Sequence, residues 1–274
     1  MTQANNNVEQ QINISRRKTL GTLSAFSVLG ATSLIGCGGG SGKNNASLVN
    51  TTSSSSSSTS SVAATTSSAA TSNAAGACVL TPSDEIGPFP LSTVLNSSTI
   101  LREAVNEDKT GVPLTLKLKL VNVNNSCSPV SGYIYIWHCD KDGLYSGYSQ
   151  TNNAGQAGKT YCRGVQYTDA DGVATFTTIY PGWYEGRVTH IHFQVFLTNY
   201  SSTAQATEIS QMAFPDAITT AVYKSALYSK GQNTSVRSNS ADHVFSDGYT
   251  YQLLTMTGNL DEGYVGELQI GLNI

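Results

Sequence analysis

Two histidines lie two residues apart in the segment His190-Ile191-His192-Phe193-Gln194-Val195-Phe196-Leu197. This segment alternates with period two, as a strand with one buried face does. His190 and His192 therefore share one face, about 7 Å apart at their bases, and Ile191 points the other way, toward a core. Imidazoles placed like this can converge on one metal ion. The alternative is a pair of partly exposed strand histidines that bind nothing.

Two tyrosines add a second type of donor. Tyr184 follows the turn signal Pro181-Gly182, and Tyr145 lies in the run Trp137-His138-Cys139-Asp140-Lys141-Asp142-Gly143-Leu144-Tyr145-Ser146-Gly147-Tyr148. A phenolate is a hard anionic oxygen donor that suits a hard cation such as Fe(III), whereas neutral imidazole accepts many metals. Iron held as Fe(II) for oxygenase work more usually has two histidines and one carboxylate. If such tyrosines joined the histidines at a metal, the set would suit ferric iron.

Four motifs follow one another around these residues. They are Gly143-x-Tyr145-Ser146-Gly147-Tyr148, then Arg163-Gly164-x-Gln166-x-Thr168-Asp169-Ala170-Asp171-Gly172, then Thr178-Ile179-Tyr180-Pro181-Gly182-Trp183-Tyr184, then Arg187-x-x-His190-Ile191-His192. In this order they resemble the intradiol ring-cleavage dioxygenases, and the chain is most similar to the secreted, single-domain bacterial branch of that family. The resemblance runs from Cys78 to about Leu272 and is strongest between Trp137 and Phe193.

The resemblance implies a non-haem Fe(3+) ion held by Tyr145, Tyr184, His190 and His192. It further implies that O2 cleaves a catechol-type substrate between its two hydroxyl-bearing carbons, giving cis,cis-muconate-type products. In the family, the tyrosine nearer the histidine pair is displaced by the substrate. Tyr184 is therefore expected to act as a general base, while Tyr145 stays bound. Glu185 has no counterpart in the family's ligand set.

Two further residues match positions near the substrate in the family. Arg187 precedes His190 by three residues, and a fixed guanidinium there would stabilise negative charge that develops in the reaction. The alternative is a surface arginine at a strand end. Gln211 stands where the family often has a glutamine. Only five residues separate Tyr184 from His190, fewer than in the soluble members, which predicts a more open pocket.

The remaining tryptophans and histidines have other expected roles. Trp137 and Trp183 either line the pocket or pack in the core, and the sequence does not decide between these alternatives. His138 and His243 are interpreted as structural residues.

Residues 1–37 are predicted to be an export signal. Ser15-Arg16-Arg17-Lys18-Thr19-Leu20 resembles a twin-arginine signal, and the apolar segment 20–35 that follows is shorter than the roughly 20 residues of a membrane span. Ser33-Leu34-Ile35-Gly36-Cys37 resembles a bacterial lipoprotein box. An acylated Cys37 would anchor the exported protein to the bacterial cell envelope. The alternative is an ordinary signal peptide with a chance cysteine.

The rest of the chain divides into a linker and one domain. Residues 38–76 are dominated by Ser, Thr and Ala, which cannot bury enough apolar surface to offset the entropy of ordering, so a disordered tether is expected. Residues 77–274 are long enough for one domain with a sizeable core. The chain is only 12% charged, with a net charge of -3, which argues against nucleic acid as a partner.

Alternating segments separated by turn residues indicate an all-β fold, an antiparallel β-sandwich with a short helix and long loops. Strands are expected at 114–123, 133–137, 173–179, 190–197, 249–256 and 265–272. One helix is expected from Asp216, as N-cap, to Lys230, with Gly231 just after its end.

Four cysteines belong to the predicted domain: Cys78, Cys127, Cys139 and Cys162. An even count in an exported domain favours two disulfides. Cys127 and Cys139 flank one predicted strand of about five residues, which separates them by far more than the roughly 6 Å that a disulfide tolerates. Of the pairings that remain, Cys78 with Cys127 and Cys139 with Cys162 is preferred.

Two other classes of function compete with the dioxygenase. One is a non-catalytic binding module that shares the sandwich and is tethered to the cell surface. Loss of a ligand tyrosine or of Arg187 would favour it, and both tyrosines and the arginine are present. The other is a zinc hydrolase or cupin-like enzyme that uses His190 and His192. It would need a third histidine or a carboxylate as ligand, and the sequence has neither at a recognisable spacing.

Overall fold

A computed structural model describes residues 78–274, and every structural statement below concerns those residues. The predicted export signal, Cys37 and the predicted linker lie outside them. Within 78–274, no helix is both long enough and apolar enough to cross a bilayer.

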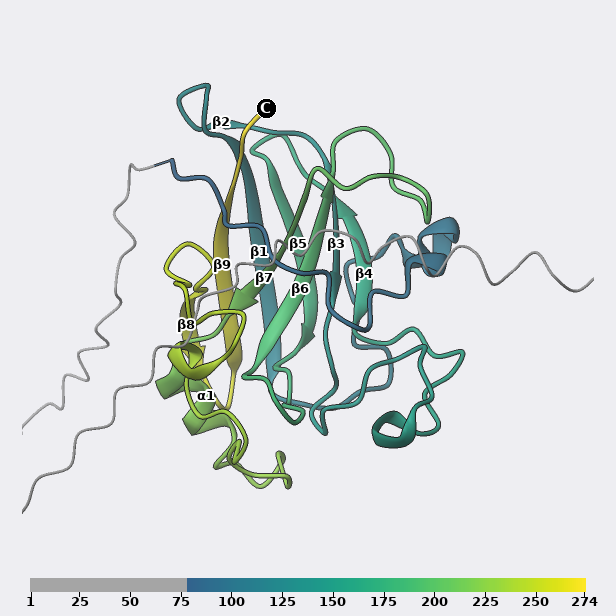
Figure 1. Cartoon of the computed structure of the whole chain (residues 1–274), viewed down its shortest axis with the longest axis vertical. Helices are drawn as coiled ribbons and strands as arrows, with labels where there is room; N and C mark the ends of the chain where they lie inside the picture. Colours follow the sequence, from purple (N-terminus) through teal and green to yellow (C-terminus); the bar gives the residue numbers. More distant parts are fainter. Residues whose placement is uncertain (1–77) are drawn as a thin grey trace, which may run out of the picture. The chain divides into compact units, whose positions relative to one another are not determined.

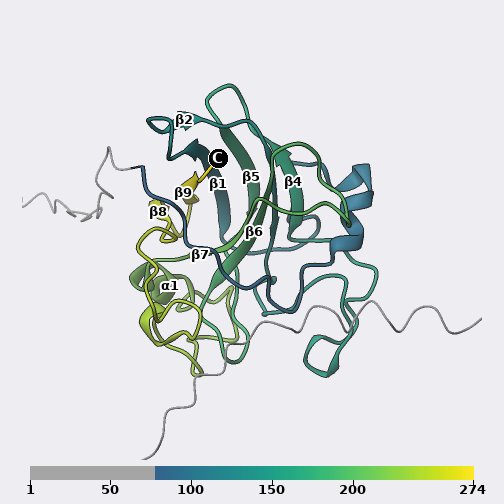
Figure 2. The same cartoon turned by 45° about the horizontal axis from the view of Figure 1, so that its top comes forward.

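Within residues 78–274, nine strands form two sheets that face each other (Figures 1 and 2). The first sheet has the order β2 (Ser128–Pro129), β1 (Pro113–Asn122), β9 (Gly263–Leu272), β8 (Thr255–Asn259), and β5 (Val173–Ile179) also pairs with β1. The second has the order β4 (Arg163–Tyr167), β3 (Tyr133–Trp137), β6 (His190–Phe196), β7 (Glu208–Ala213). The predicted all-β sandwich is confirmed. Its described strand pairs are antiparallel except for β1 with β9, which is parallel.

Helical structure is limited in the described chain. One α-helix, α1 (Asp216–Val222), lies at one end of the sheets (Figures 1 and 2). Short 3-10 helices occupy Ser92–Asn96, Ser98–Ile100, Thr151–Asn153 and Asn239–Ala241.

The core lies between the two sheets and follows the period-two pattern of the sequence. In β1, alternate leucines from Leu114 to Leu120 are buried, and Lys117 between them is exposed. Ile191 and Phe193 of β6 contribute to the same apolar cluster from the opposite sheet. Burying each such side chain stabilises the fold by about 1.5–3 kcal/mol. Ile191 therefore faces the core, as its alternation with the two histidines predicts.

The outer face of the second sheet is covered, which corrects the prediction of a half-buried β6. Every residue of β6 is buried, because the arm, residues 81–91, passes over this face. The Thr81 N–H donates to Gly271 O of β9 at 3.1 Å, and the Asp84 N–H donates to Ile209 O of β7 at 2.8 Å. Figure 1 shows the arm in dark blue, crossing β7 and β6. The histidine face of β6 is therefore an interior surface.

Most predicted strands are confirmed within two residues, but the helix is shorter than predicted. It ends at Val222 instead of Lys230, and Asp216 is its first residue rather than its N-cap. Consecutive turns follow, and they bring Tyr228 inward, where its hydroxyl donates to Tyr180 O at 2.6 Å and accepts from the Val112 N–H at 3.1 Å. These tertiary hydrogen bonds outweigh the helical propensity of the segment.

The predicted strand at 249–256 is also wrong over most of its length, because β8 begins only at Thr255. A turn at Tyr249–Gln252 brings the chain against the end of β7, where the Leu254 N–H donates to Ala213 O at 2.9 Å. Three strands of the described chain, β2, β4 and β7, have no counterpart among the predicted ones.

The predicted disulfides are not formed, since the four cysteines of the described chain are free thiols. The thiol of Cys139 donates to Gly182 O at 3.5 Å, and that of Cys78 donates to Asn122 O at 3.8 Å. Burial, and then the adjacent Cys127, raise the pKa of Cys78 to about 11. Backbone carbonyls thus satisfy two of these thiols.

Asp84, in the arm, makes the stability of the folded protein depend on pH. Burial raises the pKa of its carboxyl from 3.8 to about 6, and hydrogen bonds from Gln252 and Ser210 offset only part of that shift. The folded state thus binds the proton more tightly than the unfolded state does, so stability falls as pH rises through this window.

We expect Asp84→Asn to remove this dependence, because an amide keeps an oxygen acceptor for Gln252 without the buried charge. Since Asp84 is partly exposed, the gain above pH 6 should be only about 1 kcal/mol. Urea unfolding of both proteins at about pH 4 and about pH 7 measures the effect. Equal pH slopes for variant and wild type would contradict the assignment.

Candidate active site

Three parts of the second sheet bring the predicted site residues together. Strand β6 carries His190 and His192 on its outer face, and the neighbouring β7 places Gln211 directly opposite His192. The loop after β3 supplies Tyr145, and the loop before β6 supplies Tyr184. Residues far apart in the sequence thus meet on one face of the sheet.

Three of the four predicted ligand atoms lie close to the fourth, His190 Nε2. The Nε2 atom of His190 lies 3.1 Å from His192 Nε2, 3.4 Å from Tyr145 Oη and 3.5 Å from Tyr184 Oη. One ring nitrogen cannot satisfy three such polar groups by hydrogen bonding, because it has either one proton or one lone pair. The geometry is that of a set of donors gathered around a common partner.

Both histidines are in the protonation state that a metal requires. The Nδ1 atom of His190 lies 2.7 Å from Val188 O, and a carbonyl can only accept, so Nδ1 carries the proton and Nε2 presents its lone pair. Burial, aided by the Arg187 charge, lowers the pKa of His190 to about 3. Burial also lowers the pKa of His192 well below its usual range. Neutral imidazoles are the metal-binding form.

Tyr145 is buried and Tyr184 half-buried, and the surroundings of both oppose ionisation without a cation. Burial raises the pKa of Tyr145 well above 10, and it raises the pKa of Tyr184 to about 12 although Arg187 opposes the shift. A trivalent cation between these oxygens would favour the phenolates. Two phenols and two neutral imidazoles fit Fe(III), a hard ion. Within the described residues, no cluster of three or more His, Cys, Asp or Glu forms a metal site of another kind.

Arg187 reaches the same cluster from the loop before β6. It is only 4% exposed, so it is not a surface arginine. Its Nη1 lies 3.5 Å from His190 Nε2, and its Nη2 donates to Gln211 Oε1 at 2.7 Å. Its Nε lies 2.9 Å from a carboxylate oxygen of Asp242. The structure therefore brings Arg187 and Gln211 together beside the predicted ligands.

Asp242 was not identified from the sequence. It is fully buried, and burial alone would raise its pKa, but the Arg187 guanidinium and the Val188 N–H hold the pKa below its usual value. An aspartate some fifty residues beyond the motif carries no local sequence signal, so only the tertiary structure reveals this partner.

The sequence also did not reveal the residues that pack against the His192 ring. Trp137 stacks on His192, with ring centroids 4.9 Å apart and an angle of 3° between the planes. Gly87 of the arm also lies against this ring: it has a φ of 72°, and a Cβ there would lie 2.7 Å from His192 Cε1. Only glycine lets the backbone approach this closely with that φ. The His192 imidazole thus contacts both the Trp137 indole and the backbone of Gly87.

Tyr145 is fixed by the arm and by Arg163. Phe89 stacks on the Tyr145 ring, with centroids 4.5 Å apart. The guanidinium of Arg163 is fully buried and donates to Phe89 O at 2.7 Å and to Ser146 O at 2.8 Å. Its charge is spread over several acceptors in a fork geometry that lysine cannot reproduce. The arm and the Tyr145 loop are therefore joined through one side chain.

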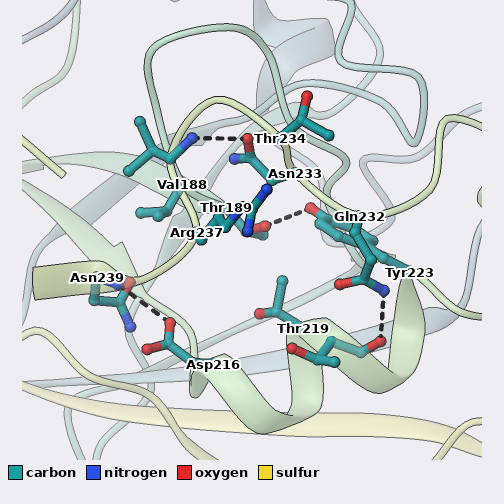
Figure 3. Close-up of a pocket in the computed structure, with 12 residues that line it drawn as sticks. Val188, Thr189, Asp216, Thr219, Tyr223, Gln232, Asn233, Thr234, Arg237 and Asn239 are labelled. Atoms are coloured by element: carbon teal, nitrogen blue, oxygen red, sulfur yellow. Dashed lines mark hydrogen bonds between the residues drawn. The ribbon is translucent and has the colours of Figure 1, made fainter. Parts of the chain in front are cut away.

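A cavity of about 310 Å³ is lined by residues just before β6, by residues of α1 and by residues between 232 and 239 (Figure 3). Its lining includes Val188, Thr189, Thr219 and Tyr223, and the hydroxyls of Thr189 and Tyr223 are hydrogen-bonded there. None of the predicted ligands lines it.

Comparison with known proteins shows which solved structures this chain resembles. The chain matches no protein-family model, and a search of curated proteins gave no match. Among solved structures, an intradiol ring-cleavage dioxygenase from Tetranychus urticae is similar, with a TM-score of 0.61 and 26% identity over 72% of this chain and 95% of that one. A second dioxygenase structure has a TM-score of 0.60 and 25% identity over the same shares. This chain has the fold of the intradiol ring-cleavage dioxygenases.

The resemblance drawn from the motifs is thereby confirmed at the level of the family, and it supports a dioxygenase. Membership of the secreted bacterial branch stays a prediction. The sequence did not decide whether Trp183 lines the pocket or packs in the core. It packs in the core and donates from Nε1 to Gly231 O at 2.9 Å. His138 is buried and lies 2.8 Å from Thr178 Oγ1, whereas His243 is exposed. Neither histidine contacts the donor cluster of the described chain.

Proposed function

We propose that this protein is a non-haem Fe(III) dioxygenase that cleaves catechol-type rings with O2 between the two hydroxyl-bearing carbons. The products would be of the cis,cis-muconate type. The observation that supports this most is the convergence of Tyr145, Tyr184 and His192 on His190 Nε2, within 3.5 Å. Arg187 adds a fixed cation at the same point.

The four donors would hold the ferric ion, which when bound would draw electron density from a chelating catecholate and make a ring carbon reactive toward O2. Tyr145 is suited to stay in place, because it is buried and its backbone N–H donates to Asn153 Oδ1 at 2.7 Å. Tyr184 is suited to move, because it is only half-buried and Glu185 and Gly186 after it are exposed.

Two of these residues would act on protons and charge. With a pKa that burial raises to about 12, the phenolate of Tyr184 is basic enough to take a proton from a substrate hydroxyl. Arg187 would donate hydrogen bonds to negative charge that develops on the substrate. Because its side chain is already fixed by Asp242 and Gln211, little reorganisation is needed when that charge appears.

The first prediction from this proposal concerns the metal. The purified protein should contain one ferric ion and be red-brown through phenolate-to-iron charge transfer. Tyr145→Phe should lose much of the colour, and His190→Ala should lose the iron itself, since a ligand is removed. Metal analysis and visible spectra measure both. A colourless wild type with stoichiometric zinc would overturn the ferric site.

The second prediction concerns the reaction. A panel of catechols, including hydroxylated benzoates and larger plant-derived aromatics, should cause O2 uptake, with both atoms of labelled O2 found in an acyclic diacid. Arg187→Ala should keep iron and colour and lower kcat by about 10²–10³-fold, because it removes a charge-stabilising donor without removing a ligand. The exposed Arg237 gives a matched control, since Arg237→Ala should keep full turnover. An iron-loaded wild type that takes up no O2 with any diol would favour the binding module.

We also propose that the protein is exported and anchored to the cell envelope through a lipidated Cys37, since Arg16-Arg17 and Ile35-Gly36-Cys37 resemble the corresponding signals. Cys37→Ala should release the protein from the membrane fraction or block its processing, and the iron site should be unchanged. Mass spectrometry of the mature N-terminus measures this. A wild-type protein that begins well after Cys37 and carries no lipid would contradict the anchor.

A further inference from the structure

We propose that Asp242 is a positioning residue that holds the Arg187 guanidinium beside the donor cluster. This inference rests on the proposed function. The Nε of Arg187 lies 3.1 Å from Asp242 Oδ1 and 2.9 Å from Oδ2. Both side chains are buried, with exposures of 5% for Arg187 and 0% for Asp242. A buried pair of this kind is fixed in orientation, because neither charge can turn toward water.

The same carboxylate also fixes the backbone next to a predicted ligand. Asp242 Oδ2 accepts from the Val188 N–H at 2.8 Å, and Oδ1 accepts from the Val244 N–H at 2.9 Å. The Val188 carbonyl in turn accepts from His190 Nδ1 at 2.7 Å. Asp242 therefore sets the position of Arg187 and of the peptide that orients the His190 ring.

The other contacts of Arg187 show which of its nitrogens is left for the substrate. Nε is held by Asp242, and Nη2 donates to Gln211 Oε1 at 2.7 Å. Gln211 is itself held, because its Nε2 donates to Glu85 O of the arm at 3.2 Å. Nη1 is directed at His190 Nε2, 3.5 Å away. With Nε and Nη2 committed to the protein, Nη1 is the donor that faces the reacting groups.

Asp242→Asn tests this role, because the amide has nearly the same shape but carries no charge and offers N–H donors where Arg187, Val188 and Val244 also donate. In the full chain, with any iron exchanged for diamagnetic Ga(III), the Arg187 Nε–H should be protected from hydrogen exchange by NMR in the wild type and lose that protection in Asp242→Asn. In the iron-loaded protein, kcat should fall by about 10–100-fold while iron content and colour are kept.

A double-mutant cycle separates positioning from general destabilisation. If Asp242 acts through Arg187, then Asp242→Asn in an Arg187→Met background should lower kcat by less than about threefold further. Asp169→Asn is the matched control, because this carboxylate also accepts from two backbone N–H groups, at 2.9 Å each, in a remote turn. It should leave kcat and Arg187 protection unchanged.

The outcomes distinguish this inference from the function on which it rests. Three results would each overturn the positioning role. They are full turnover in Asp242→Asn, unchanged exchange protection of the Arg187 Nε–H in that variant, and kcat losses of the two single variants that simply multiply in the double variant. A wild type that cleaves no diol, yet shows Arg187 protection that Asp242→Asn removes, would overturn the dioxygenase and support the positioning.

Discussion

The burial of Tyr145, His190 and His192 on the outer face of a sheet is the constraint on which this structure depends. An outer face of a sandwich is normally solvated, yet Tyr145, His190 and His192 are almost fully buried. The arm makes this possible, because its backbone hydrogen bonds join it to β9 and β7 and it covers the histidines from outside. Burial keeps the imidazoles neutral and raises the pKa values of the phenols. A cation among these atoms would favour the phenolate forms of the two tyrosines.

Two buried arginines lie beside this cluster and are stabilised in different ways. Arg187 is neutralised by the carboxylate of Asp242 and shares one nitrogen with Gln211. Arg163 instead donates to carbonyl and hydroxyl oxygens of the arm and of the Tyr145 loop. A buried charge is tolerated only when it is paired or fully hydrogen-bonded. Both arginines meet this condition, and each also joins segments that are distant in the sequence.

Strand β6 links the stability of the fold to the chemistry of the site. Its odd-numbered residues, such as Ile191 and Phe193, pack in the core, while its even-numbered residues, such as His190 and His192, face the donor cluster. A shift of register by one residue would exchange the two faces. The close packing between the sheets thus also fixes the direction of the two imidazoles. The site is therefore held in place by the same contacts that hold the core.

The sequence by itself determined the sandwich, most of its strands and the residues of the donor cluster, because these depend on local information. Alternation of apolar residues placed Leu114 to Leu120 and Ile191 in the core, and the spacing of His190 and His192 placed both on one face. The motifs added Tyr145, Tyr184 and Arg187. Where the local pattern was misleading, as in the helix predicted to reach Lys230, hydrogen bonds of Tyr228 to distant backbone outweighed propensity.

Only the tertiary structure decided how these donors are buried and oriented. The partners that do so are an aspartate fifty-five positions from Arg187, a glycine in the arm and a tryptophan of the neighbouring strand. Each is an ordinary residue in its own stretch of sequence, with no pattern that marks it. Their roles arise from proximity in space, and that proximity depends on strand pairing and on the path of the arm, which local propensities do not encode.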